Sequence, residues 1–443
     1  MKIAKLYDSI SPEERCIITL DQTRLTIENI NDGKQSVIEK QFDNEDEALK
    51  NYYTHLWEVV AKGYNQEGEP FKGVTTLFDP ESDKSSVISV EDTTLTTENI
   101  SKGKSKITEK TFESNEKAAK EYEKKVWAVL KKGWIARNEN VQEGGAIIHR
   151  IVNKYYDGAL SFENTPLGIF VYKAGENIGD ASLLLLDMQG NLSDTIELPQ
   201  GLAWSIQYHA PTNKLYLKLD QICTYDLAKK EFSTLLNIMD KPVRFLSVQS
   251  DFIAYGIHPD WVLEDKQGNG IHRQQFDVDI LKGAFPFCAS LSKKGDILAM
   301  SCKEGFIELL EATTGKSLKT IEADFPTVRQ MEFVDDDRIL VIQETHGKGR
   351  IRYFNTATDE ELTFEGLELP AYSKNTTNFC FNVDESLMIQ QNGWWMYVFD
   401  FKKKRHLYEF KLEHCGRFSR IKFIDYNTLG VSTDYGCFSL YKI

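Results

Sequence analysis

The sequence lacks paired cysteines, long apolar runs and an excess of basic residues. Its seven cysteines are scattered along 443 residues, and no two of them stand in a C-x-x-C arrangement. An odd, dispersed set is typical of reduced thiols rather than of a disulfide framework, so we expect a cytoplasmic protein. No stretch approaches the roughly 20 apolar residues of a membrane-spanning helix, and the first residues lack the apolar core of a secretory signal. We therefore expect no contact with a membrane.

Acidic residues outnumber basic ones, with 67 Asp and Glu against 53 Lys and Arg and a net charge of −14. Proteins that bind nucleic acid concentrate Lys and Arg to neutralise phosphates, so this balance disfavours broad binding to a phosphate backbone. A local patch of basic residues is still compatible with this acidic net charge. The shares of apolar residues, 41%, and of charged residues, 27%, are those of a globular protein, and the length suits two or three domains.

A tandem repeat occupies the N-terminal third of the sequence. The segment from Thr23 to Tyr64 recurs without a gap 70 positions later, from Thr93 to Trp134, which indicates a duplication. Each copy predicts three short strands followed by an amphipathic helix with apolar residues at every fourth position. Good N-cap residues stand before the two helices, Asn44 in one copy and Ser114 in the other. We therefore expect two small sheet-plus-helix domains, residues 1–66 and 72–137.

These two domains resemble the WGR module, which occurs in poly(ADP-ribose) polymerases and in many bacterial proteins. The resemblance is carried by Phe42 to Tyr64 and by Phe112 to Trp134, together with the hairpins before them. It implies the module's fold and an accessory binding role in a protein that is bacterial in style. In the polymerases, the Trp and Arg of a Trp-Gly-Arg triplet contact DNA. The corresponding positions fall near Thr26-Ile27-Glu28 and Thr96-Thr97-Glu98, and a carboxylate in place of the Arg repels phosphate.

From residue 145 onward the sequence predicts short strands separated by turns. Its clearest unit has four strands between Ala289 and Ile321, which is the pattern of one propeller blade. The predicted third strands end at an acidic or amide residue, and these residues recur 39 to 46 positions apart: Asp187, Asp226, Asp265, Glu311, Asn355 and Asp400. That spacing fits a blade repeat of about 40–45 residues. The last unit has three strands between Ser419 and Tyr441, and we expect Ala146–Val152 to supply its fourth.

The spacing resembles that of WD-repeat propellers, although no blade carries their Gly-His or Trp-Asp signature. The resemblance implies a protein-binding platform. The predicted fold class is therefore mainly β, with two α+β WGR-like modules and a seven-bladed β-propeller over residues 145–443; six or eight blades are the alternatives.

The sequence contains no motif that predicts catalysis. Thr314–Ser317 is similar to the end of a phosphate-binding loop, but the glycine that the full motif needs is missing and a hairpin turn is expected there. One loose group of potential metal ligands lacks the spacing of zinc sites; it consists of His258, Asp260, Glu264 and His272. We therefore predict no catalytic residue, no metal and no cofactor.

Five tryptophans are the candidate contacts with a partner, because large aromatic side chains dominate the energetics of many interfaces. Trp57 and Trp127 occupy matching positions on the two predicted helices. Trp394 and Trp395 are adjacent in a predicted strand and so point to opposite faces, and Trp261 lies in another strand. Packing inside the protein is the alternative for all five. The sequence thus predicts a non-enzymatic scaffold for an unidentified protein partner, with binding of DNA or RNA through the WGR-like modules as the alternative.

Overall fold

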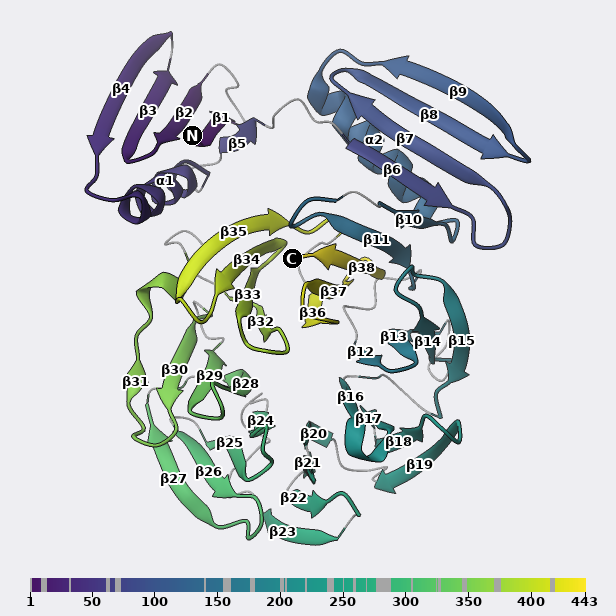
Figure 1. Cartoon of the computed structure of the whole chain (residues 1–443), viewed down its shortest axis with the longest axis vertical. Coiled ribbons are helices and arrows are strands. Elements are labelled where there is room, and N and C mark those ends of the chain that lie inside the picture. The colour runs from purple at the N-terminus through teal and green to yellow at the C-terminus, as the bar shows by residue number, and fades with distance from the viewer. Residues whose placement is uncertain are drawn as a thin grey trace.

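The computed structural model describes most of the chain. The described residues are 2–8, 14–31, 33–60, 64–67, 73–138, 141–153, 161–175, 180–199, 203, 205–219, 221–236, 243–249, 251–257, 260–267, 269–275, 288–303, 306–323, 325, 328–344, 349–369, 376–414 and 419–443. They form two small sheet-plus-helix units beside a ring of antiparallel sheets (Figure 1). Within these residues, neither helix is both long and apolar enough to cross a membrane.

The two N-terminal units have the same strand order. The first contains β1 (Lys2–Asp8), β2 (Arg15–Asp21), β3 (Arg24–Asn31), β4 (Lys34–Gln41), α1 (Glu45–Val60) and β5 (Tyr64–Glu67). The second contains β6 (Gly73–Phe78), β7 (Ser85–Glu91), β8 (Thr94–Ser101), β9 (Lys104–Thr111), α2 (Asn115–Leu130) and β10 (Ile135–Arg137). Their strand orders are β4-β3-β2-β1-β5 and β9-β8-β7-β6-β10. The matching topologies support the duplication read from the sequence.

Each unit has two strands more than the three that the sequence predicts. The strands β1 and β6 begin the units, and the short strands β5 and β10 pair with them after the helix. In β1, Ala4 and Leu6 alternate with exposed residues and enter the core, which is the two-residue period of a half-buried strand.

Both helices begin where the sequence predicts. The Oδ1 of Asn44 accepts the backbone N–H of Glu47 at 2.8 Å, and the Oγ of Ser114 accepts that of Lys117 at 3.3 Å. Each bond satisfies a backbone donor that the first helical turn leaves unpaired. The buried stripes face the sheets of their own units and comprise Ala48, Tyr52 and Leu56 on α1, and Ala118, Tyr122, Val126 and Leu130 on α2.

Six four-stranded sheets make up most of the ring. The first three are β12 (Phe162–Thr165), β13 (Gly168–Lys173), β14 (Ser182–Leu186) and β15 (Leu192–Glu197); β16 (Ser205–His209), β17 (Lys214–Lys218), β18 (Ile222–Asp226) and β19 (Glu231–Leu236); and β20 (Val243–Gln249), β21 (Phe252–Ile257), β22 (Asp260–Asp265) and β23 (Gly270–Gln275). The next three are β24 (Cys288–Leu291), β25 (Ile297–Lys303), β26 (Phe306–Glu311) and β27 (Ser317–Glu322); β28 (Val328–Val334), β29 (Ile339–Glu344), β30 (Ile351–Asn355) and β31 (Glu361–Leu362); and β32 (Asn378–Phe381), β33 (Leu387–Asn392), β34 (Trp395–Asp400) and β35 (Arg405–Lys411). The first strand of each sheet lies nearest the centre of the ring (Figure 1).

The ring and the second N-terminal unit share one nine-stranded sheet. Its order is β36 (Ser419–Phe423), β37 (Thr428–Thr433), β38 (Cys437–Lys442), β11 (Ala146–Ile151) and then β10-β6-β7-β8-β9. Strand β11 pairs antiparallel with β38 on one side and with β10 on the other, and Arg150 is opposite Phe438 in the first pairing and Ile135 in the second. The boundary expected between residues 137 and 145 therefore lies within a continuous hydrogen-bonded sheet.

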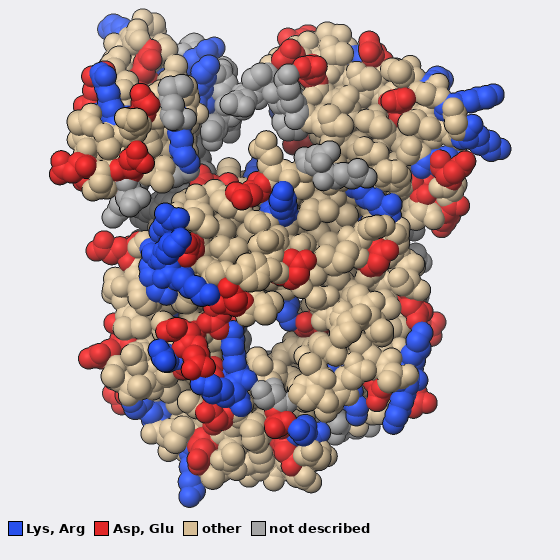
Figure 2. All heavy atoms as spheres, in the orientation of Figure 1, with Lys and Arg blue, Asp and Glu red and all other residues tan. Residues whose placement is uncertain are grey.

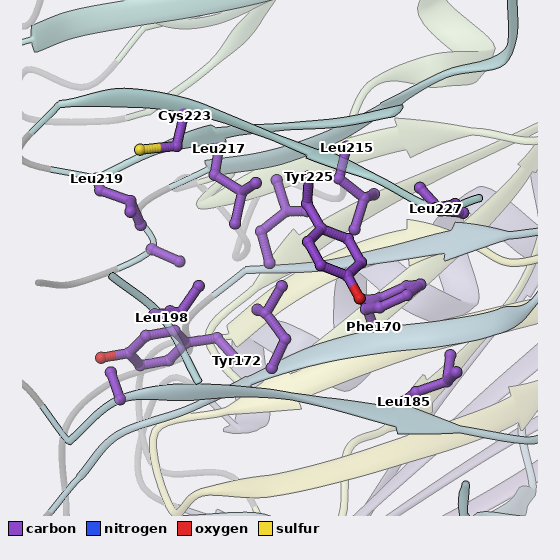
Figure 3. Packing of buried hydrophobic residues seen from close by; sticks show 14 residues of the cluster. Phe170, Tyr172, Leu185, Leu198, Leu215, Leu217, Leu219, Cys223, Tyr225 and Leu227 are labelled. Carbon is purple, nitrogen blue, oxygen red and sulfur yellow. The ribbon is translucent and has the colours of Figure 1, made fainter. Parts of the chain in front are cut away.

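Apolar side chains fill the space between neighbouring sheets of the ring. Figure 3 shows one such layer, in which Phe170 and Leu185 of the first sheet face Leu215 and Tyr225 of the second. Comparable clusters join the other sheets that follow one another along the chain. Strands that are buried on both faces read as nearly continuous apolar runs, such as Ser182–Leu186.

The periodic acidic or amide residue at the end of the third strand stabilises the turn that follows. Asp187, Asp226, Asp265 and Asn355 each accept a backbone N–H from the residue two positions later, at 2.8 to 3.0 Å. Such side-chain bonds to the backbone favour Asp and Asn in turns. The spacing of these residues therefore marks where the turns of the sheets lie, even though the Trp-Asp signature of WD repeats is missing.

Candidate functional site

The structure places the candidate tryptophans in different environments. Trp261 is 1% exposed and packs between the third and fourth sheets, with its ring 4.6 Å from that of His272. Trp394 is 44% exposed, and Nζ of Lys411 lies 5.7 Å from its ring centroid. The side chain of Trp57 lies outside the described part of the structure.

Trp395 and Trp127 lie where the N-terminal units meet the ring. Trp395 packs both against the core of the first unit and against the core formed by the fifth and sixth sheets. Trp127, on α2, stacks on the ring of His414 with a centroid distance of 4.8 Å and an interplanar angle of 27°. These two indoles therefore pack the units against the ring, and contact of either one with a partner stays a prediction.

Three turns that join first to second strands carry exposed large apolar side chains. Leu167, Val383 and Tyr426 are 53%, 78% and 50% exposed, and they lie in the turns of the first sheet, the sixth sheet and the β36–β37 pair. We call these three residues the loop-face patch. Hydrogen bonds between neighbouring sheets bring the turns together: Asn164 donates to the carbonyl of Ile424 at 2.6 Å.

A polar network holds the patch in place. The hydroxyl of Tyr426 donates to Asp384 at 2.6 Å, and Lys402 pairs with the same carboxylate at 3.2 Å. The hydrogen bond from Tyr426 is the main reason that the pKa of Asp384 lies well below its usual range. This carboxylate therefore stays ionised over the physiological pH range and can accept the hydrogen bond of Tyr426 throughout it.

The network continues to the next turns along the ring. Glu385 pairs with Lys293 and accepts the backbone N–H of Asp335, while Asp337 accepts the backbone N–H of Lys293 at 2.8 Å. Residues 335–337 all adopt left-handed backbone conformations, with φ between 53° and 67°. Such conformations persist only where surrounding contacts over-determine them. The turns of four neighbouring sheets thus form one cross-linked surface.

Charged side chains of both signs project from the innermost strands. Lys422 on β36 pairs with Glu163 on β12, and Arg420 on β36 and Glu332 on β28 lie on the same inner layer. Burial raises the pKa of Glu163, against the opposing effect of Lys422, and burial together with Arg329 lowers the pKa of Arg420. Figure 2 shows acidic and basic atoms close to the central opening.

Glu332 titrates near neutral pH. Burial raises its pKa from 4.5 to about 7, while Lys293 and Lys422 oppose the shift. Between pH 4.5 and about pH 7, Glu332 is therefore protonated in the folded protein but ionised in the unfolded chain. Stability should therefore fall as pH rises through this window, by roughly 3 kcal/mol at most, and should depend little on this group above pH 7.

Urea unfolding between pH 4.5 and 7.5 tests this expectation. Glu332→Gln, which stays neutral, should remove the loss of stability with rising pH, whereas Glu360→Gln at an exposed turn should keep it. Equal pH dependence of the wild type and Glu332→Gln would contradict the assignment.

One group of potential metal ligands forms at the junction of the second unit with the ring. His149 on β11 meets Glu413 and His414, which follow β35, and their ligand atoms all lie within 4.8 Å of one another. Sequence reasoning missed this group because the strand pairing of β11 with β38 brings together residues from opposite ends of the ring. By contrast, the predicted loose group is dispersed: His272 packs on Trp261, Glu264 bonds the hydroxyl of Tyr255, and His258 lies outside the described residues.

The comparisons with known proteins show the fold. No family model matches this sequence, and no curated protein matches it. Among 1430 similar chains of solved structures, one belongs to a structure described as the crystal structure of a mitotic checkpoint complex. It superimposes with a TM-score of 0.53 at 12% sequence identity, over 69% of this chain and 96% of that chain. The ring is thus a WD-repeat-like β-propeller.

Proposed function

We propose that this protein is a non-enzymatic interaction scaffold whose propeller presents the loop-face patch to one protein partner. In this proposal the propeller has seven blades, the last of them completed by β11, and the two N-terminal units are WGR-like accessory binding modules. The carrying observation is the patch itself: Val383 and Tyr426 lie on turns that a polar network cross-links, and Leu167 lies on the turn after β12, which a hydrogen bond from Asn164 ties to Ile424.

The geometry of the patch favours recognition of a protein. Exposed apolar side chains that lie together on a surface often mark an interaction site, and tyrosine is enriched among the residues that contribute most to binding. Because the turns are already ordered, a partner would lose little affinity to immobilising them. The charged residues around the patch, Asp384, Lys402 and Glu385, can form the polar rim of such an interface.

The similar solved structure fits this interpretation. Its description names an assembly of proteins, and propellers commonly serve as binding platforms, although the fold alone does not fix a function. The contacts of Trp395 and the shared sheet of β10 and β11 fix both N-terminal units on the propeller, so that a partner could touch the units and the propeller together.

Purification of the tagged chain from its native cell tests the proposal. A partner present in a stoichiometric amount should co-purify with the wild type and be lost from the double variant Val383→Glu and Tyr426→Ala. We expect a loss of affinity of at least about 2 kcal/mol, because the change removes two interface side chains and adds a charge. Leu318→Glu, on the outer strand β27 and similarly exposed, is the matched control. Equal recovery of the partner by the double variant and this control would contradict a role for the patch.

Binding of DNA or RNA through the N-terminal units is the second candidate function. Lys34 and Lys104 are exposed, and Figure 2 shows basic side chains at the hairpin end of the second unit. A cleft of about 760 Å³ lies beside the end of α2, and Lys131, Lys132 and Arg150 are among the residues that line it. Against this, Glu98 lies near the family's arginine position and accepts a hydrogen bond from Ser105 at 2.6 Å.

The same purification separates the two candidates when it is also read by ultraviolet absorbance. Nucleic acid that is retained at low salt and released as salt is raised would favour the second function, because phosphate contacts release counterions. A protein partner that stays bound after nuclease treatment would favour the scaffold.

A further inference from the structure

The cluster of His149, Glu413 and His414 is built on a rigid backbone. His149 lies on β11, between β10 and β38. The backbone N–H of Glu413 donates to the hydroxyl of Tyr441 at 3.0 Å, and the carbonyl of His414 accepts the hydroxyl of Thr433 at 2.7 Å. The backbones of β11 and of the segment that contains Glu413 and His414 are therefore both held against the last strands of the propeller.

The ring of His149 is oriented for metal binding by a hydrogen bond on its other side. Its Nδ1 lies 2.7 Å from the Oγ of Ser439, and its Nε2 lies 3.2 Å from the Oε2 of Glu413. A ligating histidine commonly uses its second ring nitrogen in this way, which fixes the ring and leaves the first nitrogen free to bind. The Nε2 of His149 faces only the carboxylate of Glu413, and the buried Nε2 of His414 has no hydrogen-bond partner. Buried polar atoms without a partner are rare, and an ion is one of the few explanations.

The spacing suits a small, four-coordinate ion. Ligands that lie about 2.0–2.1 Å from a tetrahedral zinc ion are separated from one another by about 3.3 Å. The pair of His149 and Glu413 already has this separation, and the widest separation in the cluster, at most 4.8 Å, has to close by about 1.5 Å. The rings of His149 and His414 meet edge to face with centroids 4.9 Å apart. On its other side, the ring of His414 is covered by the stacked indole of Trp127, while Glu413 stays accessible to water.

The donor set selects the class of metal. Two imidazoles and one carboxylate favour zinc and neighbouring divalent transition metals, whereas calcium and magnesium prefer oxygen ligands alone. Three protein ligands leave one position for water or for a further group.

We propose that His149, Glu413 and His414 bind one divalent transition-metal ion of the zinc class at the junction between the second N-terminal unit and the propeller. The ion joins the strand that links the unit to the propeller with the segment that follows β35, and Trp127 of the unit covers it. It acts as a structural clamp that holds the unit in position. This site is independent of the loop-face patch and of the partner that binds there.

Calorimetric titration of the untagged full-length chain with Zn²⁺ tests the proposal. The wild type should bind one ion per chain. Glu413→Gln and His414→Ala should each weaken binding at least about 100-fold, and Ser439→Ala, which removes the partner of His149, should weaken it about 10–100-fold. His272→Asn is the matched control, because it removes a histidine that packs on a tryptophan far from the cluster, and it should bind as the wild type does.

Titration with Co²⁺ gives a second readout. Bound Co²⁺ should produce the intense visible absorption of a four-coordinate site and should quench the fluorescence of Trp127, whose ring lies next to a ligand. Trp127→Phe should abolish this quenching while keeping the absorption. Glu413→Gln alters a side chain that is largely exposed, so its folding is secure and its result remains interpretable if His414→Ala is unstable. Failure of the wild type to bind one ion, or binding by Glu413→Gln with the affinity of the wild type, overturns the proposal.

Discussion

Ile148→Asp is expected to lower the free energy of unfolding by about 5 kcal/mol or more, enough to unfold a propeller of ordinary stability. Ile148 lies on β11 and is buried in a cluster with Ile169, Leu184, Phe438 and Leu440. Removing a buried isoleucine side chain costs about 2–5 kcal/mol, and placing an unpaired carboxylate there adds a further cost of several kcal/mol. Because β11, which precedes the first sheet in the chain, pairs with the last strand β38, the loss is expected to open the ring.

Urea unfolding followed by circular dichroism measures this effect. Val74→Asp is the matched control, since Val74 lies on β6 of the same nine-stranded sheet but is largely exposed; it should cost less than about 1 kcal/mol. If Ile148→Asp unfolds within about 1 kcal/mol of the wild type, β11 does not close the ring.

Arg352→Met is expected to destabilise the protein by about 3–5 kcal/mol. Arg352 is buried, pairs with Glu344 at 2.8 Å and makes a two-pronged contact with Glu361 at 2.6 and 2.7 Å. Its guanidinium also lies 4.7 and 5.0 Å from the ring centroids of Phe325 and Phe354. Methionine keeps much of the packing but removes the buried partner of Glu344, which keeps only the more exposed Arg350 at 2.7 Å, and breaking a buried charge pair costs several kcal/mol.

A double-mutant cycle measures how much of this loss comes from the contact between Arg352 and Glu344. Adding Glu344→Gln to Arg352→Met should restore a large part of the stability, which gives a coupling energy well above that of an exposed pair. The exposed pair of Arg24 and Glu39, at 2.7 Å, is the control, and Arg24→Met should cost less than about 1 kcal/mol. Strict additivity of the two changes at Arg352 and Glu344 would contradict this explanation.

Local periodicity was sufficient to locate most elements of the fold. The four-residue apolar period and the caps at Asn44 and Ser114 located both helices, and the regular turn residues located the sheets. What the sequence did not reveal was the sharing of one sheet by the second unit and the ring. Strand β10 has three residues, Ile135–Arg137, and so short a segment carries no recognisable period.

Candidate sites were harder to read from the sequence than the fold, because they depend on which segments become neighbours. Trp261 and Trp127 are both candidate contacts in the sequence, yet one is enclosed between sheets and the other stacks on a histidine of another segment. Val383 and Tyr426 are single residues in turns, and no pattern marks them before the turns are placed side by side. Likewise, His149 and His414 meet only through the pairing of β11 with β38.

Amide hydrogen exchange of the intact chain, read peptide by peptide, tests most directly whether the second unit and the propeller form one rigid platform. Since β10, β11 and β38 belong to one hydrogen-bonded sheet, their amides should share a single high opening free energy. The sheet of the first unit is separate, and β2 and β3 provide the internal comparison with an opening of their own. Rapid exchange of β10 and β11 while β38 stays protected would show that the unit moves independently, and would contradict the platform on which the proposed scaffold depends.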